Sequence, residues 1–170
     1  MATSGLTIYC YDTSSIFIDL HKLYPRDILG VWGSIEDMIA KDLAIAPKQV
    51  REELKQRDDE VYRWAVRHRR MFKALTREQL GSVAEVVAPF PELAHKDRPT
   101  EAADPFVIAL ALAAKRSTLF GTDYAVVTSE ERKPGKRNIP SACDHFGLRC
   151  LGLFDFMRAE GWTFVRACGK

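Results

Sequence analysis

Short apolar runs alternate with amphipathic segments along the first part of the chain. Residues 6–11, Leu-Thr-Ile-Tyr-Cys-Tyr, are rich in β-branched and aromatic side chains and predict a short buried strand. Apolar residues recur at helical spacing over residues 15–24, and Pro25 predicts the end of that helix. We expect a second helix over residues 27–39 and a second strand over residues 43–46.

The next stretch predicts a series of helices. Pro47 suits the first turn of a helix, where its missing N–H is not needed, and Lys-Gln-Val-Arg-Glu-Glu-Leu-Lys at residues 48–55 continues that helix. Two more helices are expected over Val61–Phe72 and Arg77–Val87, with Thr76 as the N-cap of the second. Proline and polar residues then predict loops, including residues 95–100.

The last third of the chain returns to alternation of strands and helices. Residues 103–115 are apolar on all sides of the predicted helix, so this helix should be buried in the middle of the domain. Ala-Val-Val-Thr at residues 125–128 predicts a strand, and a short helix, a strand and a final helix follow over residues 140–146, 148–153 and 154–160. The sequence therefore predicts an α/β fold with a central, mostly parallel sheet and helices on both faces, a three-layer α/β/α domain.

Composition and length narrow the class of protein. A chain of 170 residues suits one domain, residues 1–170, with its core over about residues 6–160. The net charge of +2 does not by itself indicate a nucleic-acid-binding protein. No apolar run is long enough to span a bilayer and no signal peptide is evident, so we expect a cytoplasmic protein without membrane contact. Four cysteines and four histidines lack the spacing of zinc or redox motifs, and isolated thiols are expected.

Four acidic residues lie where predicted strands or helices begin or end. Asp12 and Glu130 follow strands, Asp104 opens the apolar helix, and Glu53 lies beside the buried positions of its helix. Structural roles are the alternative for each. Asp12 or Thr13 would cap the following helix, Asp104 would be an N-cap before proline, and Glu52-Glu53 would be a solvated face.

A shared site for these acids favours a metal ion. Carboxylates that converge without basic partners repel one another and raise each other's pKa values. A divalent metal relieves that repulsion, and hard oxygen ligands favour Mg²⁺ or Mn²⁺. Such a site polarises a phosphate and activates water.

Basic residues gather in two further segments. The helix predicted after residue 60 carries cations interleaved with aromatic residues, and the loop after Glu130 carries more. Such surfaces hold phosphate backbones and stack bases, although a solvated face is the alternative. The candidate RNA contacts are Arg67, Arg69, Arg70, Lys133, Lys136 and Arg137.

Four ordered segments resemble the acidic motifs of PIN-domain ribonucleases. They are Asp-Thr-Ser-Ser from Asp12, Val-Arg-Glu-Glu-Leu from Val50, Ala-Asp-Pro-Phe-Val-Ile-Ala-Leu-Ala from Ala103, and Val-Val-Thr-Ser-Glu from Val126. Trp32, Trp64 and the Ile-Pro-Ser-Ala-Cys segment from Ile139 resemble a prokaryotic PIN-like branch associated with toxin–antitoxin pairs. The resemblance implies a PIN-like fold and homodimers. It also assigns Asp12, Glu53, Asp104 and Glu130 to metal binding and catalysis, with Ser14 and Thr128 as supporting hydroxyls.

Two departures from the family pattern affect these assignments. Glu130 stands where many members carry aspartate, and Glu52 precedes Glu53, which leaves the second acid ambiguous by one residue. The expected function is a Mg²⁺- or Mn²⁺-dependent endoribonuclease, the toxin of a toxin–antitoxin pair with a cognate antitoxin protein. Two alternatives are a non-catalytic PIN-like RNA-binding domain and a signalling domain phosphorylated on Asp12. The second alternative lacks the acidic pair that usually precedes a phospho-acceptor aspartate.

Overall fold

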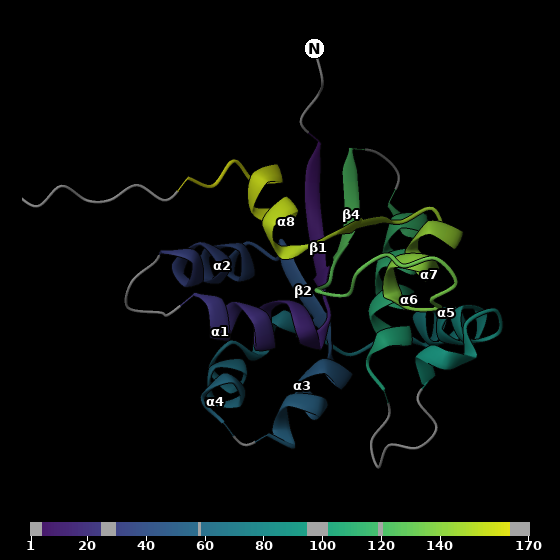
Figure 1. Ribbon diagram of the computed structural model, residues 1–170, viewed down its shortest axis with the longest axis horizontal. Helices are drawn as coiled ribbons and strands as arrows, with labels where there is room; N and C mark the ends of the chain where they lie inside the picture. Colours follow the sequence, from purple (N-terminus) through teal and green to yellow (C-terminus); the bar gives the residue numbers. More distant parts are fainter. Residues whose placement is uncertain (1–4, 25–29, 58, 95–101, 119–120, 164–170) are drawn as a thin grey trace, which may run out of the picture.

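The centre of the protein is a five-stranded sheet in which all paired strands run parallel. The computed structural model describes residues 5–24, 30–57, 59–94, 102–118 and 121–163, and the sheet is drawn in Figure 1. The strand order is β3-β2-β1-β4-β5. The strands are β1 (Leu6–Tyr11), β2 (Ala44–Pro47), β3 (Phe72–Lys73), β4 (Thr122–Val127) and β5 (Arg149–Leu151). The expected parallel sheet is confirmed.

The strand order reverses between β1 and β4. From β1 the chain builds outward through β2 and β3, and it then returns to the other side of β1 to form β4 and β5. The two central strands end level with one another, because Tyr11 pairs with Val127 and the Asp12 amide donates to the Val127 carbonyl at 3.2 Å. In open α/β sheets, ligands bind outside the carboxyl ends of the strands at such a switch point.

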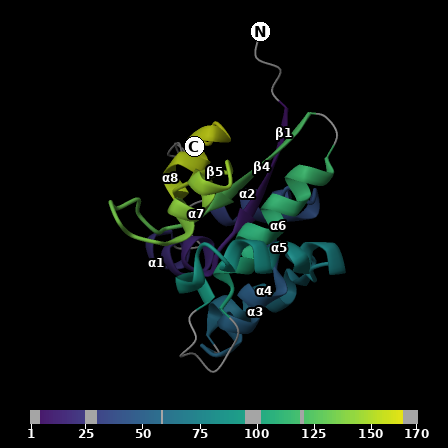
Figure 2. The ribbon, with the colours of Figure 1, turned by 90° about the vertical axis from the view of Figure 1, so that its right-hand side faces the viewer.

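Helices cover both faces of this sheet, so the expected three-layer α/β/α arrangement is confirmed (Figures 1 and 2). One face carries α5 (Arg77–Val87), α6 (Asp104–Ser117) and α7 (Ile139–His145). The other face carries the π-helix η1 (Thr13–Leu20), α1 (His21–Leu23), α2 (Val31–Ala40), α4 (Glu60–Arg67) and α8 (Leu153–Ala159). Helix α3 (Lys48–Lys55) follows β2, and short 3₁₀ turns cover Arg69–Met71 (η2) and Pro91–Ala94 (η3).

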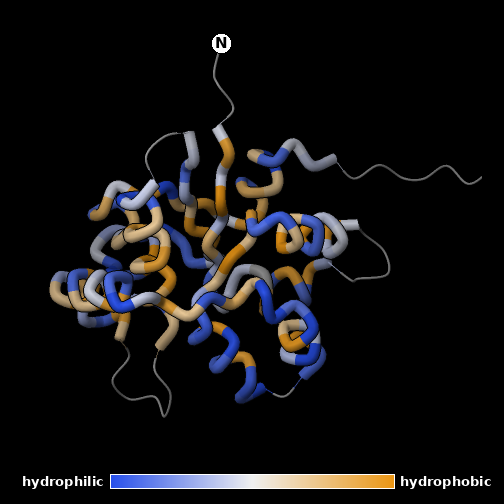
Figure 3. Tube along the Cα trace, turned by 180° about the vertical axis from the view of Figure 1, so that it is seen from behind, coloured by the Kyte–Doolittle hydropathy of each residue, from blue (hydrophilic) through white to orange (hydrophobic). Residues whose placement is uncertain are grey.

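Helix α6 forms the core of one layer, as its sequence predicts. All residues from Pro105 to Leu112 are buried, and the helix packs against α5 and against strands β4, β1 and β2. Across the sheet, Phe17 contacts the rings of Trp64 and Phe72 with ring centres 5.8 Å apart. Helices α3 and α4 carry many more hydrophilic residues, which are blue in Figure 3. Within the described ranges, every helix is too short or too polar to cross a bilayer.

One predicted helix was wrong over its second half. The helix expected over Val61–Phe72 ends at Arg67, and His68 leaves helical geometry at φ −103° and ψ 36°. A 3₁₀ turn follows, and Phe72 then enters the sheet beside Ala46. Burial of Phe72 against the sheet outweighs the helical preference of the basic segment before it, and a two-residue strand has no periodicity to detect.

Other boundaries differ by a few residues. The helix expected over residues 15–24 begins at Thr13, and its first part, Thr13–Leu20, is a π-helix. The sequence could not show this, because the hydrophobic periodicity of fewer than two turns does not distinguish i→i+5 from i→i+4 hydrogen bonding. Strand β4 begins three residues earlier than expected, and β5 is shorter than residues 148–153. The thirteen-residue helix expected over residues 27–39 is α2 from Val31 to Ala40, and residues 25–29 and 95–101 lie outside the described residues.

Candidate active site

Asp12 lies at the switch point, directly after β1. Its carboxylate accepts three hydrogen bonds: from the Ser14 hydroxyl at 2.8 Å, the Thr128 hydroxyl at 2.7 Å and the Ser15 amide at 2.9 Å. The Ser15 bond makes Asp12 the N-cap of η1, so the capping alternative holds for this residue. The Thr128 bond is not part of a cap, because it joins the ends of two neighbouring strands. Asp12 therefore has a second role at the sheet edge.

Burial dominates the electrostatics of Asp12. Only 2% of its surface is exposed, and no described cation pairs with it. Removal from water raises the pKa of Asp12, and the hydrogen bonds from Thr128, Ser14 and Ser15 act in the opposite direction. Burial has the larger effect, and the resulting pKa is about 6. A buried carboxylate of this kind gains from any cation that reaches it. Perturbed acids at a sheet edge are typical of functional sites.

Glu53 reaches the same edge from α3. The Thr13 hydroxyl donates a hydrogen bond to Oε2 of Glu53, and the Ala103 amide donates to Oε1 at 2.9 Å. Glu53 thus connects the residue after Asp12 to the residue before Asp104. Glu52 instead lies on the exposed side of the helix and pairs with Arg51 at 3.6 Å. Of the two glutamates left open by the sequence, Glu53 is the one that faces this edge.

Asp104 is not an N-cap. It is the first residue of α6, Ala103 holds the cap position, and no side-chain cap bond is formed there. The capping alternative for Asp104 was therefore wrong, because the helix begins one residue earlier than a cap at Asp104 would require. Asp104 is partly exposed, and its negative charge at the first turn is favourable to the helix dipole. The Ala103 bond to Glu53 brings this end of α6 to the carboxyl edge.

Glu130 lies beside the site, but its carboxylate is directed elsewhere. The Thr128 hydroxyl that donates to Asp12 also accepts a hydrogen bond from the Glu130 amide at 3.1 Å. Oε2 of Glu130 accepts from the Ile139 amide at 3.0 Å, in the first turn of α7. We call Asp12, Glu53, Asp104 and Glu130 with their hydroxyl partners the acidic site. Glu130 is thus connected to Asp12 through its main chain and the Thr128 hydroxyl, and its carboxylate bonds to α7.

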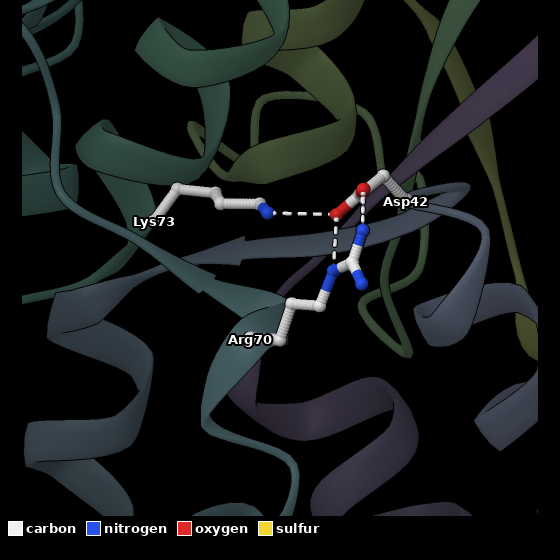
Figure 4. A network of polar contacts seen from close by, with 3 residues as sticks. All are labelled: Asp42, Arg70 and Lys73. Atoms are coloured by element: carbon white, nitrogen blue, oxygen red, sulfur yellow. Dashed lines mark hydrogen bonds and ion pairs between the residues drawn. The ribbon is translucent and has the colours of Figure 1, made fainter.

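Arg70 has an acidic partner of its own. Its guanidinium forms a two-pronged contact with Asp42, and Nζ of Lys73 lies 2.9 Å from the same carboxylate (Figure 4). Asp42 precedes β2 and Arg70 precedes β3, so this network lies toward the amino ends of these strands. The acidic site lies at the carboxyl ends. We call Asp42, Arg70 and Lys73 the amino-end network.

The cations of the loop after β4 differ in how they are held. Arg137 pairs with Glu92 at 3.0 Å, donates to the Pro89 carbonyl and lies 4.8 Å from the centre of the Phe90 ring. Lys133 pairs with Glu131 at 3.1 Å on the surface. Lys136 is exposed, as are Arg67 and Arg69. The loop follows β4 directly, so Lys133 and Lys136 belong to the same end of the sheet as Asp12.

Sequence reasoning missed three polar residues of the acidic site. The Thr13 hydroxyl donates to Glu53, the Ser15 amide donates to Asp12, and Asn138 organises the start of α7 through a capping box with Ser141. The signal for the first two was present in the hydroxyl run after Asp12, whose first and third members were interpreted only as helix-opening residues. A signal for Asn138 was also present, because asparagine just before Ile139-Pro140 fits an N-cap ahead of a proline in the first helical turn.

The comparisons with known proteins give a family without an assigned activity. A family model described as a domain of unknown function, DUF4411, matches residues 9–164. The chain belongs to the DUF4411 family. The match includes Asp12, Glu53, Asp104 and Glu130, so the acidic site lies within the family domain. Neither the curated proteins nor the solved structures gave a match.

Proposed function

We propose that this protein is a metal-dependent endoribonuclease that acts at the acidic site. The observation that carries the proposal is the pair of hydrogen bonds that Glu53 accepts, one from the Thr13 hydroxyl and one from the Ala103 amide. Thr13 directly follows Asp12, and Ala103 directly precedes Asp104. Three acidic segments separated by about forty and fifty residues thus meet at one edge of the sheet. Their order along the chain resembles that of PIN-domain ribonucleases, and this resemblance supports a hydrolytic role.

The donor set suits Mg²⁺ or Mn²⁺. Every functional group of the acidic site is an oxygen donor, and Asp12 uses three of its roughly four acceptor positions within the protein. Asp12, Glu53 and Asp104 are the residues that would hold an ion, and Glu130 would join them only if the part of its carboxylate that does not bond to Ile139 turned toward the ion. Among the described residues, no group of three His, Cys, Asp or Glu side chains is already gathered closely enough to bind a metal. A bound ion would polarise a phosphodiester and lower the pKa of a water molecule.

The residues themselves have separate tasks in this proposal. Thr128 and Ser14 orient the Asp12 carboxylate, and the Thr13 hydroxyl and Ala103 amide orient that of Glu53. Lys133 and Lys136, in the loop after β4, would contact RNA phosphates near the cleaved bond. Under this proposal the protein acts in the cytoplasm as the toxin of a toxin–antitoxin pair, as a homodimer and with an antitoxin protein as its partner. This part rests on the resemblance alone.

A second candidate is a non-catalytic RNA-binding domain with the same fold. It is favoured by one observation, the bond between Glu130 and the Ile139 amide, which occupies a carboxylate that a metal site would need. The two candidates differ in what a divalent ion does. A nuclease requires the ion for cleavage, whereas a binding domain retains RNA without it.

Cleavage of a labelled RNA pool tests the proposal. We expect fragments with Mg²⁺ or Mn²⁺, none with EDTA, and recovery when excess metal is added back. The Asp12→Asn variant, purified in parallel, separates this activity from a contaminating nuclease, which the substitution would not affect. Melting curves with and without metal test ion binding directly, since a ligand of the folded state raises its stability. RNA binding without cleavage and without a metal-induced shift would favour the second candidate and contradict the first.

A further inference from the structure

A cavity lies between the loop after β4 and helix α7. Its volume is about 290 Å³, and it is lined by Arg132, Lys133, Pro134, Asn138, Ser141 and Asp144. Pockets for small molecules usually measure about 300–1,000 Å³, so this cavity lies at the lower end of the range. Its size suits one small ring system and not a larger ligand.

The cavity adjoins the acidic site. Asn138 in its wall is followed by Ile139, whose amide donates to the Glu130 carboxylate at 3.0 Å. The Glu130 amide donates to the Thr128 hydroxyl, which in turn donates to Asp12. The wall of the cavity and Asp12 are thus joined through a few hydrogen bonds. A nucleotide next to a phosphate held at the acidic site is therefore the part of an RNA that this cavity would meet.

Arg132 presents a flat charged group to the cavity. Its Nε and Nη2 atoms donate to Oδ2 and Oδ1 of Asp144 at 3.1 and 2.9 Å, so one carboxylate holds both prongs of the guanidinium. This two-pronged geometry fixes the plane of the guanidinium. Both side chains are 56% exposed, so a ligand in the cavity can reach them.

The lining suits a nucleobase better than a phosphate. A phosphate would compete with Asp144 for the guanidinium of Arg132, whereas a ring can stack on the guanidinium and leave that ion pair intact. Unstacked RNA bases stack on arginine planes in this way, and every base has a π face. Pro134 adds an apolar ring to the same lining.

We propose that this cavity binds one unstacked base of a single-stranded RNA, with the base on the guanidinium of Arg132 and beside Pro134. Asp144 is a positioning residue, because it acts through Arg132. Lys133, in the same lining, contacts the backbone phosphate of that nucleotide. The inference rests on the proposed function for its ligand, RNA, but it does not require that the RNA is cleaved.

Two short oligoribonucleotides with the same backbone test the base pocket. One carries a single base at its centre, and the other has stable abasic residues throughout. Their binding is measured by fluorescence anisotropy in EDTA, which stops metal-dependent cleavage. We expect the oligonucleotide with the base to bind about fivefold more tightly or better, whichever of the four bases it carries.

Two variants separate stacking from attraction between charges. Arg132→Lys keeps the positive charge and removes the flat guanidinium, so the advantage of the base should disappear while the abasic oligonucleotide binds as before. Asp144→Asn removes a negative charge, so attraction alone predicts tighter binding of both oligonucleotides with an unchanged advantage. Under the proposal the advantage falls in Asp144→Asn, because Arg132 is no longer held in its plane.

Arg158→Lys is the matched control. Arg158 also pairs with an exposed aspartate, Asp155, at 2.9 Å, but it belongs to α8, whereas the cavity is lined by the loop after β4 and by α7. This variant should retain the full advantage of the base. Unaltered binding of the abasic oligonucleotide by Arg132→Lys shows that the variant is folded.

The outcomes separate the base pocket from the proposed nuclease. Equal binding of the two oligonucleotides by the parent protein, or an unchanged advantage in Arg132→Lys, would overturn the pocket even if RNA is cleaved with Mg²⁺ or Mn²⁺. An advantage of the base that disappears in Arg132→Lys supports the pocket even if no cleavage is found. In that case only the nuclease proposal fails.

Discussion

Asp12 and Asp42 are two carboxylates at opposite ends of the same sheet, held in opposite ways. Asp12 is buried among hydroxyl and amide donors, and burial raises its pKa to about 6. Asp42 is exposed at the surface between Arg70 and Lys73, whose hydrogen bonds and charges hold its pKa well below the usual range. The protein compensates the charge of Asp42 with its own cations, whereas the hydrogen-bond partners of Asp12 among the described residues are neutral hydroxyl and amide donors.

This difference in charge compensation indicates that Asp42 is a structural acid and that Asp12 is a candidate metal ligand. In the amino-end network, Arg70 and Lys73 supply the positive charge that balances Asp42. Their hydrogen bonds also hold the turn before β2 against β3. In the acidic site, the hydroxyl and amide groups that donate to Asp12 are neutral, and so are the Thr13 hydroxyl and the Ala103 amide that donate to Glu53. A buried negative charge among neutral donors leaves room for an external cation to bind with a large gain.

The largest expected effect is on cleavage by variants of the acidic site. Asp12→Asn and Asp104→Asn keep the size of the side chain and remove the charge, so each should lower the rate of metal-dependent RNA cleavage at least about a hundredfold. Asp42→Asn is the matched control and should retain the parent rate. Rates on one labelled RNA at saturating metal provide the measurement. Full activity of Asp12→Asn or Asp104→Asn would remove that residue from the catalytic assignment.

The elements that surround Asp12 could be predicted from the sequence. The strand before Asp12, the buried helix after Asp104 and the strand before Thr128 each have strong local patterns, and parallel strands place their carboxyl ends at one edge. Asp12 and the hydroxyls of Ser14 and Thr128 could therefore be assigned to one edge of the sheet from their positions along the chain.

Other features depend on tertiary packing and had no local signal. Nothing near Glu130 indicates that its carboxylate bonds to Ile139, because that contact needs the start of α7 to fold back onto the loop. The pairing of Arg70 with Asp42 also had no local signal, because Asp42 lies twenty-eight residues earlier in the chain.

The next largest effect concerns stability and pH. Folding raises the pKa of Asp12 from 3.8 to about 6, so between these values the folded state keeps a proton that the unfolded chain has lost. The contribution of Asp12 to stability is thus greatest below pH 4 and is lost as the pH rises to about 6, by at most about 3 kcal/mol. Urea unfolding without metal, across pH 4 to 8, should show this loss in the parent and not in Asp12→Asn. A parent-minus-variant difference that is constant with pH would contradict the raised pKa.

The two neighbouring glutamates of α3 offer a matched pair. Glu53→Gln removes the charge that faces the acidic site and should lower metal-dependent cleavage about tenfold or more. Glu52→Gln removes an equal charge from the exposed side of the same helix and should have little effect. Cleavage rates and metal-induced melting shifts for both variants provide the test. Equal losses from the two would indicate a general charge effect and not a specific ligand.

A smaller effect is expected from the exposed cations. If Lys133 and Lys136 contact phosphates, replacing both with glutamine should reduce the salt slope of RNA binding by about 0.7 for each phosphate that is no longer neutralised. Arg67→Gln with Arg69→Gln removes two exposed charges from the segment that leads to β3. Binding measured by fluorescence anisotropy over a salt series compares the two pairs. A reduced slope only for the arginine pair would mean that RNA follows that segment and that the loop assignment is wrong.

The smallest effect is expected at the amino-end network. Asp42→Asn removes the acceptor of two surface ion pairs, and such pairs contribute at most about 1 kcal/mol because water and salt screen them. Its pH dependence should have the opposite sign to that of Asp12. Pairing lowers the pKa of Asp42, so its contribution is present at neutral pH and is lost as the carboxyl group becomes protonated in acid. Unfolding curves of parent and Asp42→Asn at low and high salt measure this contribution. A loss of stability that is large and insensitive to salt would mean that Asp42 acts as a buried structural acid. Asp42 and Asp12 would then differ in their hydrogen-bond partners and not in charge compensation.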